Sequence, residues 1–113
     1  MLSKESDLRK KAWAAHHQGN LGDAEVIYRQ LLETSGPELP LDCRDAINLG
    51  ALLRSQGRLK EAKAHYHHYL KLFHENTALR INGINALLEM QEHDLAKVWI
   101  EEGLAKTPTN TEL

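Results

Sequence analysis

Residues 57–66 read Gly57-Arg-Leu-Lys-Glu-Ala62-Lys-Ala-His-Tyr66, and they repeat the pattern of residues 19–28, Gly19-Asn-Leu-Gly-Asp-Ala24-Glu-Val-Ile-Tyr28. Both stretches follow G-x-L-x-x-A-x-x-x-Y, and a weaker copy around Ala96 keeps the alanine and a bulky residue four places later. The three alanines lie 62 − 24 = 38 and 96 − 62 = 34 residues apart. A period of this size indicates stacked supersecondary units and not one compact enzyme core.

Working outward from these copies, apolar residues recur at helical spacing between Gly, Asn and Pro breaks. Gly19 and Gly57 suit the left-handed residue that ends a helix, and Asn20, Asp42 and Asn76 are predicted N-caps. Residues 35–40 (Ser-Gly-Pro-Glu-Leu-Pro) exceed the basic period and read as a longer loop. Six helices are therefore predicted, over residues 4–18, 21–34, 42–56, 59–73, 77–91 and 94–106.

The middle copy resembles the tetratricopeptide repeat, whose pattern is roughly W-x2-L-G-x2-Y, then A-x3-F, then P. Leu49-Gly50 stand in its L-G positions, and Ala62 and Tyr66 in its A-x3-F positions. The last copy keeps Ala96, Ile100 and Pro108 but has Gly83-Ile84 in place of Leu-Gly. The resemblance implies an all-α, right-handed superhelical array of antiparallel helix pairs. It also implies one domain over residues 1–113, with repeats at about 4–36, 43–76 and 77–110.

Small residues are expected where the helices of a pair cross, because larger side chains would force them apart. These positions are Ala12, Gly50, Ala24, Ala62 and Ala96. Bulky residues at Tyr28, Tyr66 and Ile100 are expected to fill the gap toward the next repeat. The last helix is predicted to expose Ile100 and Leu104, as if residues 109–113 opened a further repeat. The chain would then be part of a longer protein, or two copies would form a homodimer through this end.

Composition narrows the classes of function. The 113 residues are 42% hydrophobic and 27% charged, with a net charge of −2. That balance argues against general nucleic-acid binding, which needs a concentrated basic face. A single cysteine, Cys43, excludes an internal disulfide. The start of the chain lacks the apolar run of a secretory signal, and no segment has the ~20 apolar residues of a membrane helix. A soluble, cytoplasmic protein without membrane contact is expected.

The sequence holds no convincing catalytic or metal-binding constellation. Neither H-E-x-x-H nor a Cys pair nor a phosphate-binding glycine loop occurs. Asp42 and Asp45 share a helix face, but acidic residues are common in a first turn as partners of the helix dipole. His65 and His68 share a helix face, but a structural zinc site has four protein ligands, and two imidazoles do not complete one. We therefore expect no enzyme activity, no cofactor and no bound metal.

The resemblance implies that the first helix of each pair lines a concave face that binds extended peptides or helices. Asn48 and Asn82 are 82 − 48 = 34 residues apart, so they hold equivalent places in successive repeats. Such a ladder resembles the asparagines lining O-linked N-acetylglucosamine transferase, where amides hold a peptide backbone through paired donors and acceptors. The candidate peptide-binding residues are Arg9, Trp13, His16, His17, Arg44, Asn48, Arg54, Asn82 and Asn85.

Repeats that clamp the C-terminal carboxylates of chaperones use convergent Lys, Arg and Asn residues. Here those places hold Arg9, Trp13, Asn48, Ala78 and Asn82. Because the fifth helix brings no cation there, a doubly charged carboxylate would be poorly compensated. The sequence thus predicts a non-catalytic protein-interaction module, similar in its first repeat to bacterial proteins with a downstream transferase. Two alternatives stay open: the substrate-targeting region of a larger glycosyltransferase or sulfotransferase, and an oligomerisation element.

Overall fold

The computed structural model describes residues 2–35 and 43–106, which form six α-helices joined by short turns. No strand occurs in these two stretches. The predicted all-α fold is confirmed, and each helix begins and ends within two residues of its predicted limits. The helices are α1 (Leu2–His17), α2 (Leu21–Ser35), α3 (Arg44–Ser55), α4 (Leu59–Leu72), α5 (Thr77–Glu89) and α6 (His93–Lys106).

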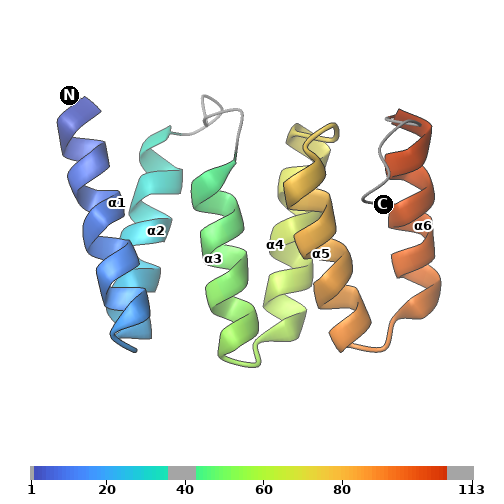
Figure 1. Ribbon diagram of the computed structural model, residues 1–113, viewed down its shortest axis with the longest axis horizontal. Coiled ribbons are helices and arrows are strands. Elements are labelled where there is room, and N and C mark those ends of the chain that lie inside the picture. The colour runs from blue at the N-terminus through green and yellow to red at the C-terminus, as the bar shows by residue number, and fades with distance from the viewer. Residues whose placement is uncertain (1, 36–42, 107–113) are drawn as a thin grey trace.

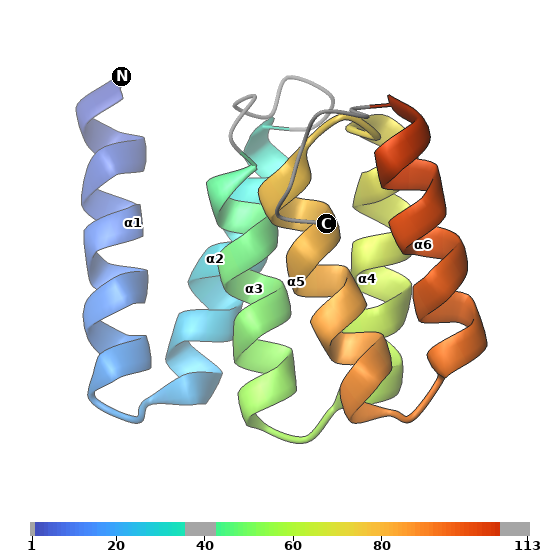
Figure 2. The same cartoon turned by 45° about the vertical axis from the view of Figure 1, so that its right-hand side comes forward.

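The helices stack as three antiparallel pairs, α1 with α2, α3 with α4 and α5 with α6 (Figure 1). Each helix also packs against the next one along the chain, and α3 packs directly on α5. The array measures 38 × 29 × 21 Å. In Figure 1, α1 stands in front of part of α2 and α5 stands in front of α4; in Figure 2, α3 stands in front of α2 and α5 in front of α4. The molecule therefore has one layer of first helices and one layer of second helices.

The turn inside each pair uses a left-handed residue, as predicted for Gly19 (φ 83°) and Gly57 (φ 73°). The amide that follows then donates to a carbonyl five residues back, for example from Arg58 N to Leu53 O at 2.9 Å. The third turn repeats this geometry with Gln91 at φ 61°. Positions 19, 57 and 91 have the same spacing as the three alanines, so the repeat is present in the backbone as well as in the core.

One predicted N-cap is confirmed and another lies outside the described residues. The Asn76 side chain accepts a hydrogen bond of 2.8 Å from the amide of Leu79, which satisfies a free N–H of the first turn of α5. The predicted loop at 35–40 begins one residue late, because Ser35 is the last residue of α2. The rest of that loop, Asp42, Pro108 and residues 109–113 fall outside the described stretches.

The predicted small positions are buried, and the helices approach closely there. Ala12, Ala24, Ala62 and Ala96 are inaccessible to solvent, and Gly50 is buried beneath the ring of Tyr66. A Cβ on Gly50 would lie 2.6 Å from Tyr66 Cε1, so only glycine fits at this crossing. The glycine of the Leu-Gly pair in the second repeat is thus required by the aromatic ring packed against it.

The third pair departs from the repeat pattern in two coupled positions. Gly83 stands where the second pair has Leu49, and the indole of Trp99 fills the space, 2.7 Å from where a Cβ on Gly83 would lie. Ile100 was predicted to be exposed on the last helix, but it is half-buried and packs against the core. Leu104 is exposed as predicted. The apolar face of α6 is therefore smaller than the sequence indicated. None of the helices in the described stretches is long and apolar enough to cross a membrane.

Candidate functional site

The candidate face is formed by α1, α3 and α5, which lie toward the viewer in Figure 1. All the predicted peptide-binding residues fall on these three helices. They are Arg9, Trp13, His16 and His17 on α1, Arg44, Asn48 and Arg54 on α3, and Asn82 and Asn85 on α5.

On α1, Trp13 and His17 form an exposed aromatic pair. The Trp13 side chain is 58% exposed, and its ring stacks on His17 with centroids 3.8 Å apart and planes at 27°. The Nδ1 atom of His17 lies 2.9 Å from the Trp13 carbonyl oxygen, which fixes the imidazole in place. An exposed indole held flat in this way offers a rigid apolar surface with little entropy left to lose on binding.

His16 lies differently from its neighbour. It is half-buried, with its ring 6.3 Å from that of Tyr28 on α2 in an edge-to-face arrangement. Burial, followed by the nearby charge of His17, lowers the pKa of His16. The residue therefore packs between the helices of the first pair, and of the two histidines only His17 is fully exposed.

Arg9 is committed to a buried carboxylate on α3. Its Nε donates to Asp45 Oδ1 at 2.9 Å and to Oδ2 at 3.1 Å, and its Nη2 donates to Oδ2 at 2.9 Å. The Asp45 side chain is 0% exposed and that of Arg9 is 21% exposed. The pair joins α1 to α3. Because a buried carboxylate that loses its cation costs several kcal/mol, Arg9 is poorly placed to leave Asp45 and bind a ligand.

Arg54 is also paired across helices. Its Nε donates to Glu89 Oε1 at 2.7 Å, and its Nη2 bonds the same oxygen. The pair ties α3 to α5 in the same way that Arg9 and Asp45 tie α1 to α3. Successive first helices are therefore joined by one arginine–carboxylate pair each, and these arginines already have partners. The second layer has similar links, Arg58 with Glu25 and Lys63 with Glu92.

The asparagines supply the neutral polar groups of this face. Asn82 donates from Nδ2 to the carbonyl of Ala78 at 2.8 Å within its own helix, and its amide oxygen is an acceptor. Asn48 is half-buried and Asn85 is exposed. Arg44 is exposed at the start of α3. Because α3 packs on α5, the amides at 48 and 82 lie on adjacent helices.

Beneath this face lie tyrosine hydroxyls that the sequence analysis did not assign a role. The hydroxyl oxygens of Tyr28 and Tyr66 are buried, and Arg54 lies near that of Tyr66. Burial raises the pKa of Tyr66 to about 12, so the group is a neutral phenol at physiological pH. Its ring lies against Gly50, so the phenol packs on the backbone of α3.

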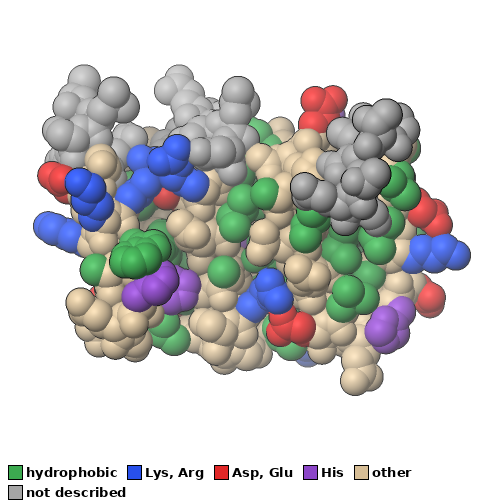
Figure 3. All heavy atoms as spheres, in the orientation of Figure 1, with side chains coloured by type: hydrophobic (Ala, Val, Ile, Leu, Met, Phe, Trp, Pro, Cys, Tyr) green, Lys and Arg blue, Asp and Glu red, His purple; other side chains and the backbone are tan. Residues whose placement is uncertain are grey.

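Figure 3 shows the character of the face as a whole. Over α1, histidine side chains lie against hydrophobic ones, and between α3 and α5 a basic group lies against an acidic one. The charges at the centre of the face are thus compensated internally. A ligand on this face would meet the aromatic pair, the amide groups and the exposed Arg44.

The histidines of α4 do not converge. His65 places Nε2 2.6 Å from the carbonyl oxygen of Ala46, while His67 stacks near Trp99 with centroids 6.1 Å apart. In residues 2–35 and 43–106, no group of three or more His, Cys, Asp or Glu side chains is arranged to hold a metal ion. Of the two aspartates weighed for catalysis, Asp45 is buried in its ion pair and Asp42 lies outside the described stretches; the single thiol, Cys43, is buried in the core.

One cluster escaped the sequence analysis altogether. Arg80 lies on α5 between the second and third pairs and lines a cavity with Lys71, Trp99 and Glu102. A signal for it was present in the sequence. Arg80 is spaced three and four residues before Gly83 and Ile84, so a cation occupies the apolar stripe of α5.

The comparisons with known proteins concern the fold. No protein-family model matches the chain, and no curated protein is significantly similar to it. Among solved structures, a tetratricopeptide repeat protein from Parabacteroides merdae ATCC 43184 superposes with a TM-score of 0.80 at 25% identity. That match covers 97% of this chain and 43% of the other, so the chain spans less than half of that neighbour.

A second solved structure is the first TPR of Spaghetti (RPAP3), bound to the HSP90 peptide SRMEEVD. It superposes with a TM-score of 0.76 at 19% identity, covering 97% of this chain and 86% of that one. Both neighbours share the paired-helix array described above. The chain therefore has the tetratricopeptide-repeat fold, built from three helix pairs.

Proposed function

We propose that the chain is a protein-interaction module whose face of α1, α3 and α5 binds an extended peptide segment of a partner protein. The observation that carries this proposal is the exposed Trp13, held against His17 at one end of a face with amide groups further along. The binding of a peptide by the Spaghetti domain, which has the same fold, supports the class of ligand. No catalytic role is part of the proposal.

The ligand would be held mainly through its backbone and one apolar side chain. Asn48, Asn82 and Asn85 supply amide donors and acceptors that pair with a main chain whatever its sequence. Trp13 supplies the apolar contact. Arg9 and Arg54 keep their partners Asp45 and Glu89, so they shape the face and add little charge to it. A strongly acidic peptide therefore has no advantage on this face.

The test begins with an unbiased selection of 12-residue peptides displayed on phage, using the whole chain as bait. The affinity of a selected peptide is then measured for wild type and for Asn48→Ala combined with Asn82→Ala. Two lost hydrogen bonds at roughly 1 kcal/mol each predict a loss of about 30-fold. The matched control is Gln30→Ala with His68→Ala, which removes two exposed polar side chains from α2 and α4.

Equal affinity for the wild type and the asparagine variant would contradict the proposal, as would a selection that yields no binder. A second measurement separates backbone from side-chain recognition. N-methylation of the bound peptide at the contacted amides should reduce affinity, while alanine substitution of its polar side chains should not. Oligomerisation through α6 and a targeting role within a larger transferase remain predictions, and light scattering on the isolated chain tests the first.

A further inference from the structure

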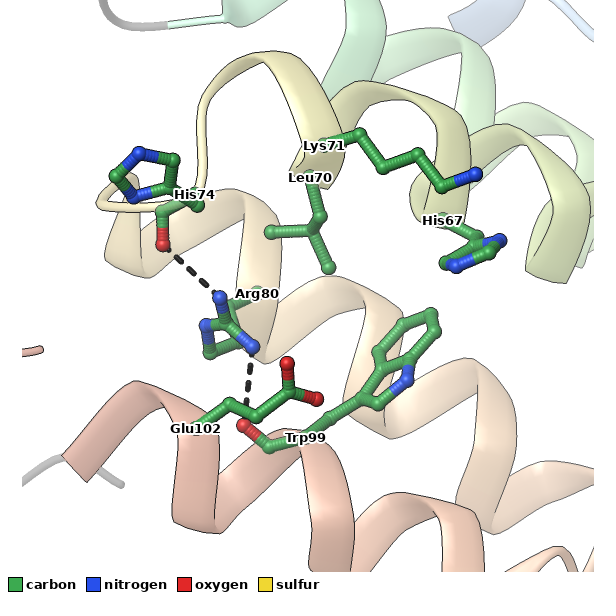
Figure 4. A pocket seen from close by; sticks show the side chains of 7 residues that line it. All are labelled: His67, Leu70, Lys71, His74, Arg80, Trp99 and Glu102. Atoms are coloured by element: carbon green, nitrogen blue, oxygen red, sulfur yellow. Dashed lines mark hydrogen bonds between the residues drawn. The ribbon is translucent and has the colours of Figure 1, made fainter. Parts of the chain in front are cut away.

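A second candidate site lies between α4, α5 and α6, apart from the proposed peptide-binding face. It is a cavity of about 220 Å³ whose walls come mainly from the second helices α4 and α6 (Figure 4). It shares no residue with the peptide-binding face. Its lining residues are His67, Leu70, Lys71, His74, Arg80, Trp99 and Glu102.

The guanidinium of Arg80 is held at one end of this cavity by neutral groups. Its side chain donates from Nη1 to the Trp99 carbonyl oxygen at 3.1 Å and from Nη2 to the His74 carbonyl oxygen at 2.9 Å. The residue is only 4% exposed, and burial lowers its pKa while Glu102 opposes that shift. Within the described stretches no carboxylate lies within ion-pair distance of Arg80. A buried cation with neutral acceptors favours an anion beside it.

The other side of the cavity adds a second cation and an apolar wall. Figure 4 shows Lys71 and His67 along the α4 rim, opposite Arg80 and Glu102, with Leu70 and Trp99 between them. Trp99 is buried, so one face of its indole forms a fixed surface. In Figure 4 the Lys71 ammonium lies near His67, away from Arg80. A group that enters here would therefore meet Arg80 with its charge and the indole with its apolar part, with Lys71 at the rim.

The size and charge of the cavity select the ligand. A volume of about 220 Å³ is below the roughly 300–1,000 Å³ of sites that hold drug-sized ligands or cofactors. It suits a single amino-acid side chain. Glu102 lies in the same cavity, so a doubly charged phosphate would face a carboxylate as well as the two cations. A singly charged carboxylate fits the net charge best.

We infer that this cavity receives the carboxylate of one aspartate or glutamate side chain of a partner protein. Arg80 binds the carboxylate, Lys71 adds a positive charge at the rim, and the methylene groups of the entering side chain pack on Trp99 and Leu70. The inference is independent of the peptide-binding face, because none of the residues that line the cavity belongs to that face. The two sites would let one partner, or two, contact both layers of the array.

The test uses Trp99 as its reporter. The chain holds two tryptophans, so Trp13→Phe leaves Trp99 as the sole indole. Its fluorescence is followed while the peptide acetyl-Gly-Leu-Glu-Leu-Gly-amide is added to millimolar concentrations. The glutamine peptide of the same length is the control, and the phosphoserine peptide is the third arm. We expect the glutamate peptide to bind roughly 5-fold or more tightly than the glutamine peptide, because a charged acceptor strengthens the hydrogen bonds.

Variants at exposed positions locate the binding without disturbing the fold. Lys71→Gln should weaken the glutamate peptide about 5-fold, whereas Lys97→Gln, an exposed lysine of α6 outside the cavity, should leave affinity unchanged. Glu102→Gln should tighten binding because it removes the competing carboxylate. The combined Asn48→Ala and Asn82→Ala variant should bind like wild type, which separates this site from the proposed peptide-binding face.

Several outcomes would overturn the inference. One is equal affinity for the glutamate and glutamine peptides. Another is an unchanged Trp99 fluorescence up to about 10 mM peptide, which would place the Kd above that concentration. A third is an equal effect of Lys71→Gln and Lys97→Gln on affinity. Tighter binding of the phosphoserine peptide than of the glutamate peptide would show that the cavity prefers a phosphate, and it would refute the assignment of a carboxylate. Weaker binding after Glu102→Gln would show that this carboxylate is a partner of the ligand and not its competitor.

Discussion

The ring of Tyr66 lies directly over Gly50, so the only space for a side chain at position 50 is already occupied by the phenol. Both residues are buried, and they join α3 to α4 at the crossing point of the second pair. The Cβ of Tyr66 also approaches the next pair, because it lies 3.1 Å from where a Cβ on Gly83 would stand. Tyr66 therefore contacts three helices, and glycine is required beside its ring at position 50 and beside the indole of Trp99 at position 83.

Gly50→Ala should destabilise the protein by about 1–2 kcal/mol. Overpacking costs roughly 1–3 kcal/mol, and the better helix propensity of alanine returns up to about 1 kcal/mol. Gly22→Ala is the matched control, because a Cβ on Gly22 in α2 meets nothing within 4 Å. That variant should be neutral or more stable. Urea unfolding of both variants measures the difference, and an equally stable Gly50→Ala would show that the phenol can shift.

Gln91→Gly should stabilise the protein by on the order of 1 kcal/mol. Gln91 has φ 61°, a left-handed conformation that costs a residue with a Cβ about 1–2 kcal/mol and glycine much less. Gly19 and Gly57 already fill the equivalent turns. The control is Gln56→Gly, since Gln56 follows α3 at φ −90° and should gain nothing from glycine. Thermal melts compare the two, and a stabilised Gln56→Gly with an unchanged Gln91→Gly would contradict the account.

Arg9→Ala should cost about 3 kcal/mol, the lower end for breaking a buried ion pair, because Arg9 itself is partly exposed. The variant leaves the buried Asp45 carboxylate without its guanidinium. Combining Arg9→Ala with Asp45→Ala should recover part of the loss, and a double-mutant cycle on unfolding free energies gives the coupling. Simple additivity of the two single variants would show that the pair is not coupled. Because Arg9→Ala also destabilises the face around Asp45, a loss of peptide binding in this variant would not by itself identify Arg9 as a ligand contact.

The helices could be predicted from the sequence because their signals are local. Apolar residues at helical spacing place each helix, and Gly19, Gly57 and Asn76 mark ends through backbone conformation and capping. These signals need no knowledge of distant contacts, so the predicted limits agree closely with the structure. The repeat period then supplied the pairing, because it places each helix against its neighbours.

The partners of the charged side chains could not be predicted in the same way. Arg9 finds Asp45 36 residues later, and Arg54 finds Glu89 35 residues later. Single-residue reasoning assigned both arginines to a ligand, although their partners lie about one repeat further along. Scanning for an opposite charge at that offset would have found both pairs. The third pair has Gly83 at the position of Leu49, and Trp99 fills the space beside it. This compensation could not be predicted, because each of the two residues departs from the repeat pattern and only their contact in the structure explains both.

His65 gives the protein a pH-dependent element of stability. Burial lowers its pKa below the ordinary 6.5; the hydrogen bond to the Ala46 carbonyl opposes that shift, and the charges of Arg29 and His68 add to it. The folded state thus favours the neutral imidazole. As pH falls below 6.5, the unfolded chain takes up a proton at this residue before the folded chain does. Stability is therefore full above that pH and is lost as pH falls toward the lowered, folded-state pKa.

His65→Gln should reduce that loss, because the glutamine amide can still donate to Ala46 but does not titrate. The measurement is the urea midpoint at pH 7.5 and at pH 5.5 for wild type and variant. His68→Gln, which removes an exposed imidazole from the same helix, is the control. If both variants changed the difference in urea midpoint between these two pH values by the same amount, the burial of His65 would not be the cause of the pH dependence. The pH dependence would then reflect the total charge of the chain instead.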